Sequence, residues 1–295
     1  MIYNVDNLYS EKSEMEGKLC LITGATDGIG KETAKCLAEY NAQVILVGRD
    51  QKKGGAVRKE LIAQTGNDQI NFMRADLSNM NAIQKLSVEI HKKYNKLNVL
   101  INNVGAFFAK REITDEGFEK TFALNHLGYF LLTKLLLDLI KKSTDARIIN
   151  VSSRAHAGST INFEDLQGEK DFSGWNAYKQ SKLMNIMFTY KLSELLQDTP
   201  ITINTLHPGF VRSRFGENND GMVGTGLKLA KKIGAVSIKQ GAKTSVFLAS
   251  SPIVKDVTGK YFVKCKSEKS SIASYNTSDI DRLWKTTEQC IAFLS

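Results

Sequence analysis

Tyr178 and Lys182 lie four residues apart, a spacing that places both side chains on one face of a helix. A phenol ordinarily keeps its proton to about pH 10, too high for acid–base chemistry near neutral pH. A fixed ammonium group beside the phenol favours the phenolate and lowers its pKa. The pair therefore suggests a tyrosine that serves as general acid and base, with an exposed helix pair as the alternative.

The composition indicates one large domain, although the length alone also permits two. The chain has 295 residues, 42% of them hydrophobic and 24% charged, without repeats or low-complexity blocks. Its net charge of +9 suits an anionic membrane surface or a phosphorylated ligand, whereas widely spread lysines argue against a nucleic-acid partner. The four cysteines lack metal-ligand and CxxC spacing, so we predict no metal site and expect buried thiols in a reducing compartment.

The amino terminus and the most apolar run bear on location. Residues 1–16 are predicted to form a polar extension without signal-peptide features, and residues 17–295 the domain. The run Leu127–Ile140 contains Lys134 and Asp138 and is too short and too charged to span a bilayer. We therefore expect a soluble cytoplasmic protein without a transmembrane segment.

Short apolar runs alternate with helical patterns, which is typical of a parallel sheet covered by helices on both faces. The predicted strands are Leu19–Thr23, Gln43–Val47, Ile70–Arg74, Asn98–Ile101, Arg147–Val151, Thr202–Leu206 and Gly259–Val263. The predicted helices are Ile29–Tyr40, Gly54–Gln64, Met80–Tyr94, Phe118–Lys141, Ala177–Leu196 and one around Asp281–Trp284. This order predicts a doubly wound α/β (Rossmann) fold, whose ligand crevice lies beyond the carboxyl ends of the strands.

A glycine cluster follows the first predicted strand and opens the first helix. Glycines permit close backbone approach, and a helix N-terminus favours pyrophosphate. The spacing of Gly24, Gly28 and Gly30 is wider than GxGxxG, and an ordinary glycine turn is the alternative. The predicted cofactor contacts here are Thr23, Gly24, Thr26, Asp27, Gly28, Ile29 and Gly30.

The end of the second predicted strand bears on the choice of cofactor. NAD-binding folds place an acidic residue on the ribose 2′-hydroxyl about 20 residues further on. Here Gly48 is followed by Arg49, and a guanidinium suits a 2′-phosphate, which a carboxylate would repel. We therefore predict NADP(H) over NAD(H), with Asp50 as the counter-argument if the strand ends later.

Together these motifs resemble those of the short-chain dehydrogenase/reductase family over roughly residues 17–265. Further matching segments are Asp76-Leu77, Asn102–Gly105, Asn125, Asn150–Ser153 and His207–Ser213. Val104 replaces the family's usual alanine, and Ser213 its common threonine. A finer resemblance, to the retinol dehydrogenase-like branch, is carried by Gly28–Ala34, Gly48–Asp50, Asn162–Leu166, Tyr178–Leu183, the insertion Arg154–Ala177 and Asp281–Trp284.

The resemblance implies reversible hydride transfer between a nicotinamide and a carbonyl/alcohol pair. It assigns proton transfer to Tyr178 and a hydrogen bond to the reacting oxygen to Ser153, with Ser152 as the fallback. It implies that Lys182 binds the ribose hydroxyls and lowers the tyrosine pKa, and that Asn125 supports a water-linked proton path. The further cofactor contacts that it implies are Asp76, Leu77, Asn103, Val104, Gly105, Pro208, Gly209, Val211 and Ser213, besides Tyr178 and Lys182.

Substrate and partners are only coarsely encoded. We predict that residues 215–240 cover the pocket and that Phe107 and Phe108 line it. If the cover is helical, its apolar residues lie on one face and its lysines on the other. This pattern suits a lipophilic substrate, peripheral membrane contact or packing of the cover on its own domain. We predict a lipophilic aldehyde, ketone or alcohol. The apolar helices Leu127–Ile140 and Leu183–Leu196 either pair in a homo-oligomer or are buried against the sheet.

Two other classes of function compete with an enzyme. A non-catalytic NADP(H)-sensing protein of the same fold would often have lost Ser153, Tyr178 or Lys182, and all three are present. A membrane- or nucleic-acid-binding module is supported only by the net charge and the lysine-bearing cover. We therefore favour the oxidoreductase.

Overall fold

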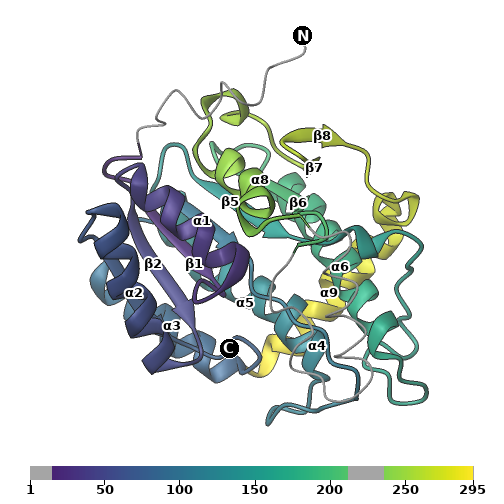
Figure 1. Ribbon diagram of the computed structural model, residues 1–295. Coiled ribbons are helices and arrows are strands. Elements are labelled where there is room, and N and C mark those ends of the chain that lie inside the picture. Colours follow the sequence, from purple (N-terminus) through teal and green to yellow (C-terminus); the bar gives the residue numbers. More distant parts are fainter. Residues whose placement is uncertain (1–14, 212–235, 295) are drawn as a thin grey trace.

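Eight strands form one sheet in the computed structural model, which describes residues 15–211 and 236–294 (Figure 1). The strands are β1 (Leu19–Thr23), β2 (Gln43–Gly48), β3 (Ile70–Arg74), β4 (Val99–Asn102), β5 (Arg147–Val151), β6 (Thr202–His207), β7 (Lys260–Val263) and β8 (Lys266–Glu268). Their order is β3-β2-β1-β4-β5-β6-β7-β8, and only β7 and β8 pair antiparallel. The order reverses between β1 and β4, where a doubly wound α/β domain binds its ligand.

Alternate strand residues supply two hydrophobic cores, because successive side chains point to opposite faces of a sheet. On β1, Leu19 and Leu21 face one core, whereas Cys20 and Ile22 face the other. The first core is closed by α3 (Met80–Lys93), α5 (Gly128–Lys141), α6 (Gly174–Leu195) and α9 (Thr277–Ile291). The second core is closed by α1 (Gly28–Glu39), α2 (Gln51–Thr65) and α8 (Ile238–Ser250). Both faces of the sheet are therefore covered, as predicted for parallel strands.

The main helices begin at polar caps, which satisfy backbone donors that a helix leaves unpaired. The caps of α1, α2, α3, α6, α8 and α9 are Asp27, Asp50, Asn79, Ser173, Ser237 and Asn276. The short elements are α4 (Lys120–Phe122), the π-helical turn η2 (Ala123–Leu127), η3 (Arg154–His156), η4 (Pro252–Val254), η5 (Ile272–Tyr275) and η6 (Ala292–Leu294). Two of these short turns involve predicted site residues: η2 contains Asn125, and η3 directly follows Ser153.

The predicted elements agree closely with the structure. Strands β1, β3 and β5 have the predicted bounds, β2, β6 and β7 differ by one residue at one end, and β4 is shifted by one residue. The sequence patterns did not predict α8, β8 or the π-helical turn. Residues 1–14 of the predicted extension and residues 215–235 of the predicted cover lie outside the described part of the chain. The last residues of the predicted cover lead into α8.

The most apolar helix runs without interruption from Lys120 to Lys141 and is longer than the apolar run recognised in the sequence. Judged by its length and its mean hydropathy of 1.3, it is the one helix among the described residues that could cross a membrane. However, 78% of the most apolar 18-residue stretch of this helix is buried inside the fold. This burial is typical of a core helix, and it explains the apolar surfaces of α5 and α6 without a second subunit.

The four cysteines are free thiols. Cys20 is buried, but Cys36, Cys265 and Cys290 are only partly buried, so the expectation of buried thiols is correct for one of them. Burial raises the pKa of the Cys20 and Cys36 thiols to about 12. Both thiols therefore stay protonated and are poor nucleophiles at neutral pH.

Candidate active site

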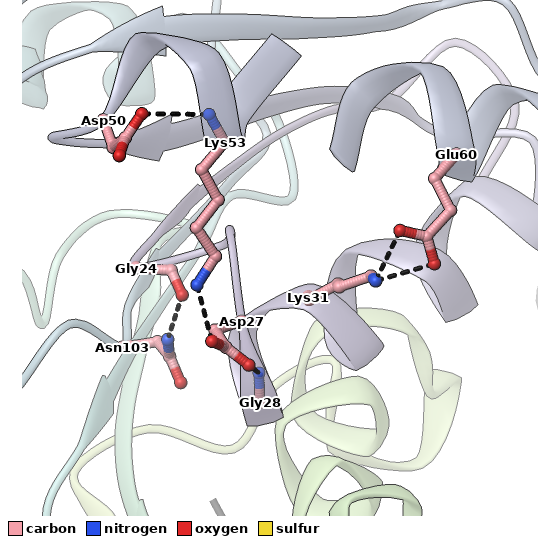
Figure 2. Close-up of polar contacts among 8 residues, drawn as sticks. All are labelled: Gly24, Asp27, Gly28, Lys31, Asp50, Lys53, Glu60 and Asn103. Carbon is pink, nitrogen blue, oxygen red and sulfur yellow. Dashed lines mark hydrogen bonds and ion pairs between the residues drawn. The ribbon is translucent and has the colours of Figure 1, made fainter. Parts of the chain in front are cut away.

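The turns that follow β1 and β4 are joined by hydrogen bonds where the strand order reverses. The Thr23 hydroxyl accepts the backbone N–H groups of Asn103 at 2.8 Å and Val104 at 3.0 Å. The Asn103 amide donates to the Thr23 carbonyl oxygen at 2.7 Å. It also donates to the Gly24 carbonyl oxygen at 3.4 Å (Figure 2). Four predicted cofactor contacts from two loops thus form one connected surface.

Gly30 lies so close to this surface that a side chain would collide with it. A Cβ atom at Gly30 would lie 2.4 Å from the Gly24 carbonyl oxygen and 2.5 Å from the Asn103 amide nitrogen. Gly24 and Gly28 have φ angles of 66° and 50°, which favour glycine. The loop therefore forms a backbone-lined cradle at the start of α1, and this shape fits the pyrophosphate of a dinucleotide.

Two carboxylates beside the cradle are bound by neighbouring groups (Figure 2). Asp27 caps α1 and pairs with the Lys53 ammonium at 2.5 Å. Asp50 accepts the backbone N–H of Lys53 at 2.9 Å and thereby caps α2. Arg49 is exposed, and its carbonyl oxygen accepts the Nε–H of Arg74 at 3.2 Å. Cationic side chains thus gather at the carboxyl ends of β2 and β3, Asp27 is paired with one of them, and Asp50 is bound by a backbone N–H.

Ser153 and Tyr178 meet beyond the carboxyl end of β5. Tyr178 on α6 is 7% exposed, and Ser153 lies close enough for hydrogen bonding by its side chain to lower the Tyr178 pKa. The Ser153 hydroxyl also accepts the N–H of Ala155 at 3.1 Å. Ser152 is buried and donates its hydroxyl to the Lys182 carbonyl oxygen at 2.7 Å. Ser153, not Ser152, is therefore the serine placed beside Tyr178.

Lys182 lies one helical turn beyond Tyr178 and is buried. Its ammonium nitrogen donates to the Val151 carbonyl oxygen at 3.1 Å and lies 5.8 Å from the centroid of the Tyr178 ring. A Cβ atom at Gly105 would lie 3.0 Å from this nitrogen and 3.4 Å from the Asn125 side-chain oxygen. Gly105 thus packs directly against both Lys182 and Asn125, and a side chain at this position would crowd them.

Asn125 lies in the π-helical turn, a widening of the helix that often marks functional sites. Its amide accepts the N–H of Ala106 and donates to the Ala106 carbonyl oxygen, each at 3.0 Å. The same amide donates to the Ser181 hydroxyl at 3.0 Å. The structure therefore gathers Asn125, Ser153, Tyr178 and Lys182 around one end of the sheet.

Comparison with known proteins identifies the family. A family model described as short chain dehydrogenase matches residues 18–223. The chain belongs to the short chain dehydrogenase family. Retinol dehydrogenase 12 of Mus musculus is 39% identical over 274 residues, which are 93% of this chain and 86% of that protein. Retinol dehydrogenase 14 of Mus musculus is 37% identical over 95% of this chain and 87% of its own length.

Solved structures give the same fold. The crystal structure of an uncharacterized protein from Mycobacterium paratuberculosis has a TM-score of 0.76 at 28% identity, covering 95% of this chain and 96% of its own. A short chain dehydrogenase from Escherichia coli CFT073 complexed with NADPH has a TM-score of 0.67 at 22% identity, covering 87% and 100%. The predicted retinol dehydrogenase-like membership is thus confirmed: this short chain dehydrogenase is a nicotinamide-dependent oxidoreductase of carbonyl and alcohol groups.

Burial determines how the two central groups of this dehydrogenase ionise. Burial raises the pKa of Tyr178 to about 12, and the hydrogen bond with Ser153 acts more weakly in the opposite direction. Burial lowers the pKa of Lys182 to about 7. We expected Lys182 to lower the tyrosine pKa, but the net direction is upward, because desolvation of the buried phenol outweighs the effect of its neighbours.

The remaining predicted cofactor contacts follow the carboxyl ends of β3 and β6. They are Asp76 and Leu77 after β3, and Pro208, Gly209 and Val211 after β6. The Asp76 carboxylate accepts the Ser78 N–H at 3.0 Å and its hydroxyl at 2.7 Å, so this loop is internally fixed. Ser213 lies outside the described residues.

Sequence reasoning missed Trp175, one helical turn before Tyr178. Its ring stacks on the Tyr178 ring with centroids 5.8 Å apart, and Phe107 meets the edge of both rings. Trp175 is 49% exposed, which leaves part of its surface available to a ligand. Phe108, predicted to line the same pocket, instead packs in the first hydrophobic core, and its ring lies under the Lys120 ammonium. The spacing of three residues before Tyr178 was the signal that could have found Trp175.

Proposed function

We propose that this protein is an NADP(H)-dependent oxidoreductase that interconverts a lipophilic aldehyde or ketone and its alcohol, with Tyr178 as general acid and base. The observation that carries the proposal is the placement of Ser153 beside the buried Tyr178, with Lys182 one turn further along the same helix. NADPH oxidation with all-trans-retinal, decanal and a steroid ketone tests it. NADPH binding without turnover of any carbonyl or alcohol would favour the non-catalytic sensing protein instead.

Each polar group has a defined part in the proposed reduction. The bound nicotinamide supplies hydride to the carbonyl carbon. Tyr178 gives its proton to the carbonyl oxygen, and Ser153 donates a hydrogen bond to the same oxygen. The Ala155 N–H already occupies a lone pair of the serine oxygen, so the hydroxyl hydrogen stays available for donation. In alcohol oxidation the direction of proton transfer reverses.

Lys182 and Asn125 support this proton transfer from behind the tyrosine. Lys182 lies against the loop after β4 at Gly105, and its family counterpart implies that it binds the ribose hydroxyls. Asn125 lies against the same glycine and fixes the adjoining loop through two hydrogen bonds to Ala106. We therefore propose that Asn125 supports a water-linked proton path to Lys182.

The charges beside the cradle support NADP(H) over NAD(H). Asp50, the residue that could have bound a ribose 2′-hydroxyl, uses its carboxylate to cap α2. Asp27 is neutralised by Lys53. A 2′-phosphate after β2 would therefore meet the exposed Arg49 guanidinium, whereas the Asp50 carboxylate is oriented toward the first turn of α2.

We expect Arg49→Ala to raise the KM for NADPH about 10- to 100-fold and to change the KM for NADH less than about twofold. A charge-assisted hydrogen bond to a phosphate contributes about 1.5–3 kcal/mol, and NADH has no phosphate at this position. Steady-state kinetics with both cofactors measures the effect, with the exposed Lys85→Ala on α3 as control. Equal losses with both cofactors, or a wild-type preference for NADH, would contradict the assignment.

The lipophilic substrate is supported by the aromatic surface beside the reacting group. Trp175 and Phe107 both contact the Tyr178 ring, so a carbonyl that reaches the tyrosine hydroxyl passes these apolar side chains. Aromatic side chains contribute large apolar contact area to ligand sites. The relatives named retinol dehydrogenases are consistent with the same preference.

Trp175→Ala is expected to raise the KM for decanal and all-trans-retinal roughly 5- to 50-fold, because the truncation removes about 1–2 kcal/mol of apolar contact. The KM for propanal, which is too short to cover the indole, should change much less. Trp175→Phe keeps an aromatic surface and serves as the matched control. If all three aldehydes were affected equally, Trp175 would not contact the substrate chain.

A further inference from the structure

His156 is a buried histidine that uses both ring nitrogens in hydrogen bonds. Its Nδ1 lies 2.7 Å from the carbonyl oxygen of Ser153, and its Nε2 lies 3.1 Å from the backbone nitrogen of Ser271. A carbonyl oxygen can only accept and a backbone N–H can only donate, so the proton resides on Nδ1. Burial lowers the pKa of His156, which keeps the ring in this neutral form at physiological pH.

The bond to Ser153 acts on the backbone that orients the serine hydroxyl. Ser153 is the first residue of the turn that continues into η3, and His156 is the last residue of η3. The Ser153 carbonyl oxygen accepts both the backbone N–H of His156 at 3.2 Å and the ring Nδ1–H. Two bonds from one residue therefore fix the carbonyl, and with it the direction in which the Ser153 side chain leaves the backbone.

The bond to Ser271 connects this turn to the helix that carries Tyr178. The Ser271 carbonyl oxygen accepts the Ser274 hydroxyl at 2.6 Å, which also bonds Ser270 at 2.6 Å. The Ser270 hydroxyl in turn lies 2.7 Å from the hydroxyl of Tyr190, a residue of α6. Hydrogen bonds thus run from the turn after β5, through the segment after β8, to α6.

We propose that His156 is a positioning residue that holds the Ser153 hydroxyl toward Tyr178 by joining the Ser153 carbonyl oxygen to the Ser271 N–H. This inference rests on the proposed function, because it requires Ser153 to act on the reacting oxygen. His156 does not touch the substrate. Its effect on turnover passes through Ser153 alone, and cofactor binding does not depend on it.

Two substitutions at His156 separate its two bonds. In His156→Asn the amide nitrogen replaces Nδ1 and keeps the donor to Ser153, whereas in His156→Gln the amide oxygen replaces Nε2 and keeps only the acceptor for Ser271. We expect kcat to fall about 10-fold or more in His156→Gln and about threefold in His156→Asn, which loses only the bond to Ser271. The KM for NADPH should be unchanged in both. Turnover is measured with whichever of all-trans-retinal and decanal the wild-type protein reduces faster.

A Ser153→Ala background shows whether the effect passes through the serine. If it does, His156→Gln lowers kcat in the wild-type background but causes no further loss in Ser153→Ala. A purely structural role predicts equal losses in both backgrounds, and equal losses in the Asn and Gln variants; either result overturns the inference. If Ser153→Ala itself retains full turnover, the proposed role of Ser153 fails and this inference fails with it.

A third variant covers the case in which His156→Gln does not fold. Ser271→Pro removes the N–H that donates to Nε2, and the φ of −63° at Ser271 already suits proline. We expect it to lower kcat severalfold in the wild-type background and to have no further effect in Ser153→Ala. A folded Ser271→Pro variant with wild-type kcat would contradict the connection to the segment after β8.

Discussion

Tyr178→Phe is expected to lower kcat by roughly 100- to 10,000-fold while NADPH binds as it does to the wild-type protein. The substitution removes the hydroxyl that we propose transfers the proton and keeps the ring that packs against Trp175 and Phe107. The packing of the site is therefore preserved, and the loss appears in the chemical step. Single-turnover NADPH oxidation gives the rate, and NADPH fluorescence titration gives the affinity.

Tyr94→Phe is the matched control for this experiment. Tyr94 follows α3, and its hydroxyl accepts a hydrogen bond from Asn71 at 3.2 Å, away from the site residues. Its loss should leave kcat within about twofold of wild type. A Tyr178→Phe enzyme with near-normal kcat would refute the assignment of Tyr178, whereas loss of NADPH binding would point to a structural role.

Lys182→Met is expected to lower kcat by at least about 100-fold and, at the same time, to raise the melting temperature by about 2–6 °C. The lysine is buried, and the loss of its hydration lowers its pKa. Its charge is therefore costly to the folded state. The Val151 carbonyl oxygen loses the ammonium donor but remains 3.4 Å from the Tyr129 hydroxyl.

The pH dependence of this stabilisation has a definite sign. The pKa of Lys182 is about 7 in the folded protein, against an ordinary value of 10.5, so the unfolded chain binds this proton more readily. The destabilisation is fully present below about pH 7 and disappears as the pH rises toward about 10.5. The increase in melting temperature caused by Lys182→Met should therefore be larger at about pH 6 than at about pH 9.

Thermal unfolding at these two pH values measures the effect, and NADPH turnover at each pH gives the activity. Lys85→Met on α3 replaces an exposed lysine by the same residue and should change neither quantity appreciably. A lower melting temperature for Lys182→Met at both pH values would show that the ammonium stabilises the fold. In that case the expected conflict between stability and activity at this position would be absent.

The sequence predicts the strands of this fold well because most of them are buried on both faces. Leu19–Thr23 is apolar throughout apart from its last residue, and a run of this kind between turn signals has few alternatives. Strand β8, Lys266–Glu268, is entirely exposed and carries no apolar pattern, so nothing in its composition distinguishes it from a loop. The π-helical turn is also hidden, because one widened turn barely changes a helical period.

The candidate site was predictable where spacing alone places side chains. Tyr178 and Lys182 share a helix face, and the glycine loop must follow β1. Spacing does not reveal burial, so the low pKa of Lys182 and the high pKa of Tyr178 appear only in the folded protein. The link from His156 to Ser271 joins residues 115 positions apart, and no local pattern indicates it.

The position of β1 between β2 and β4 has a consequence for the protein as it is synthesised. β1, β2 and β3 emerge first, but one edge of β1 stays without its partner until Val99–Asn102 has left the ribosome. That edge is an apolar strand that invites wrong pairing while it is open. The parts of the site also arise in order: the dinucleotide cradle can close once β4 is made, well before the tyrosine and lysine of α6 are translated. The nascent chain can thus acquire its nucleotide-binding half before the residues proposed for catalysis exist.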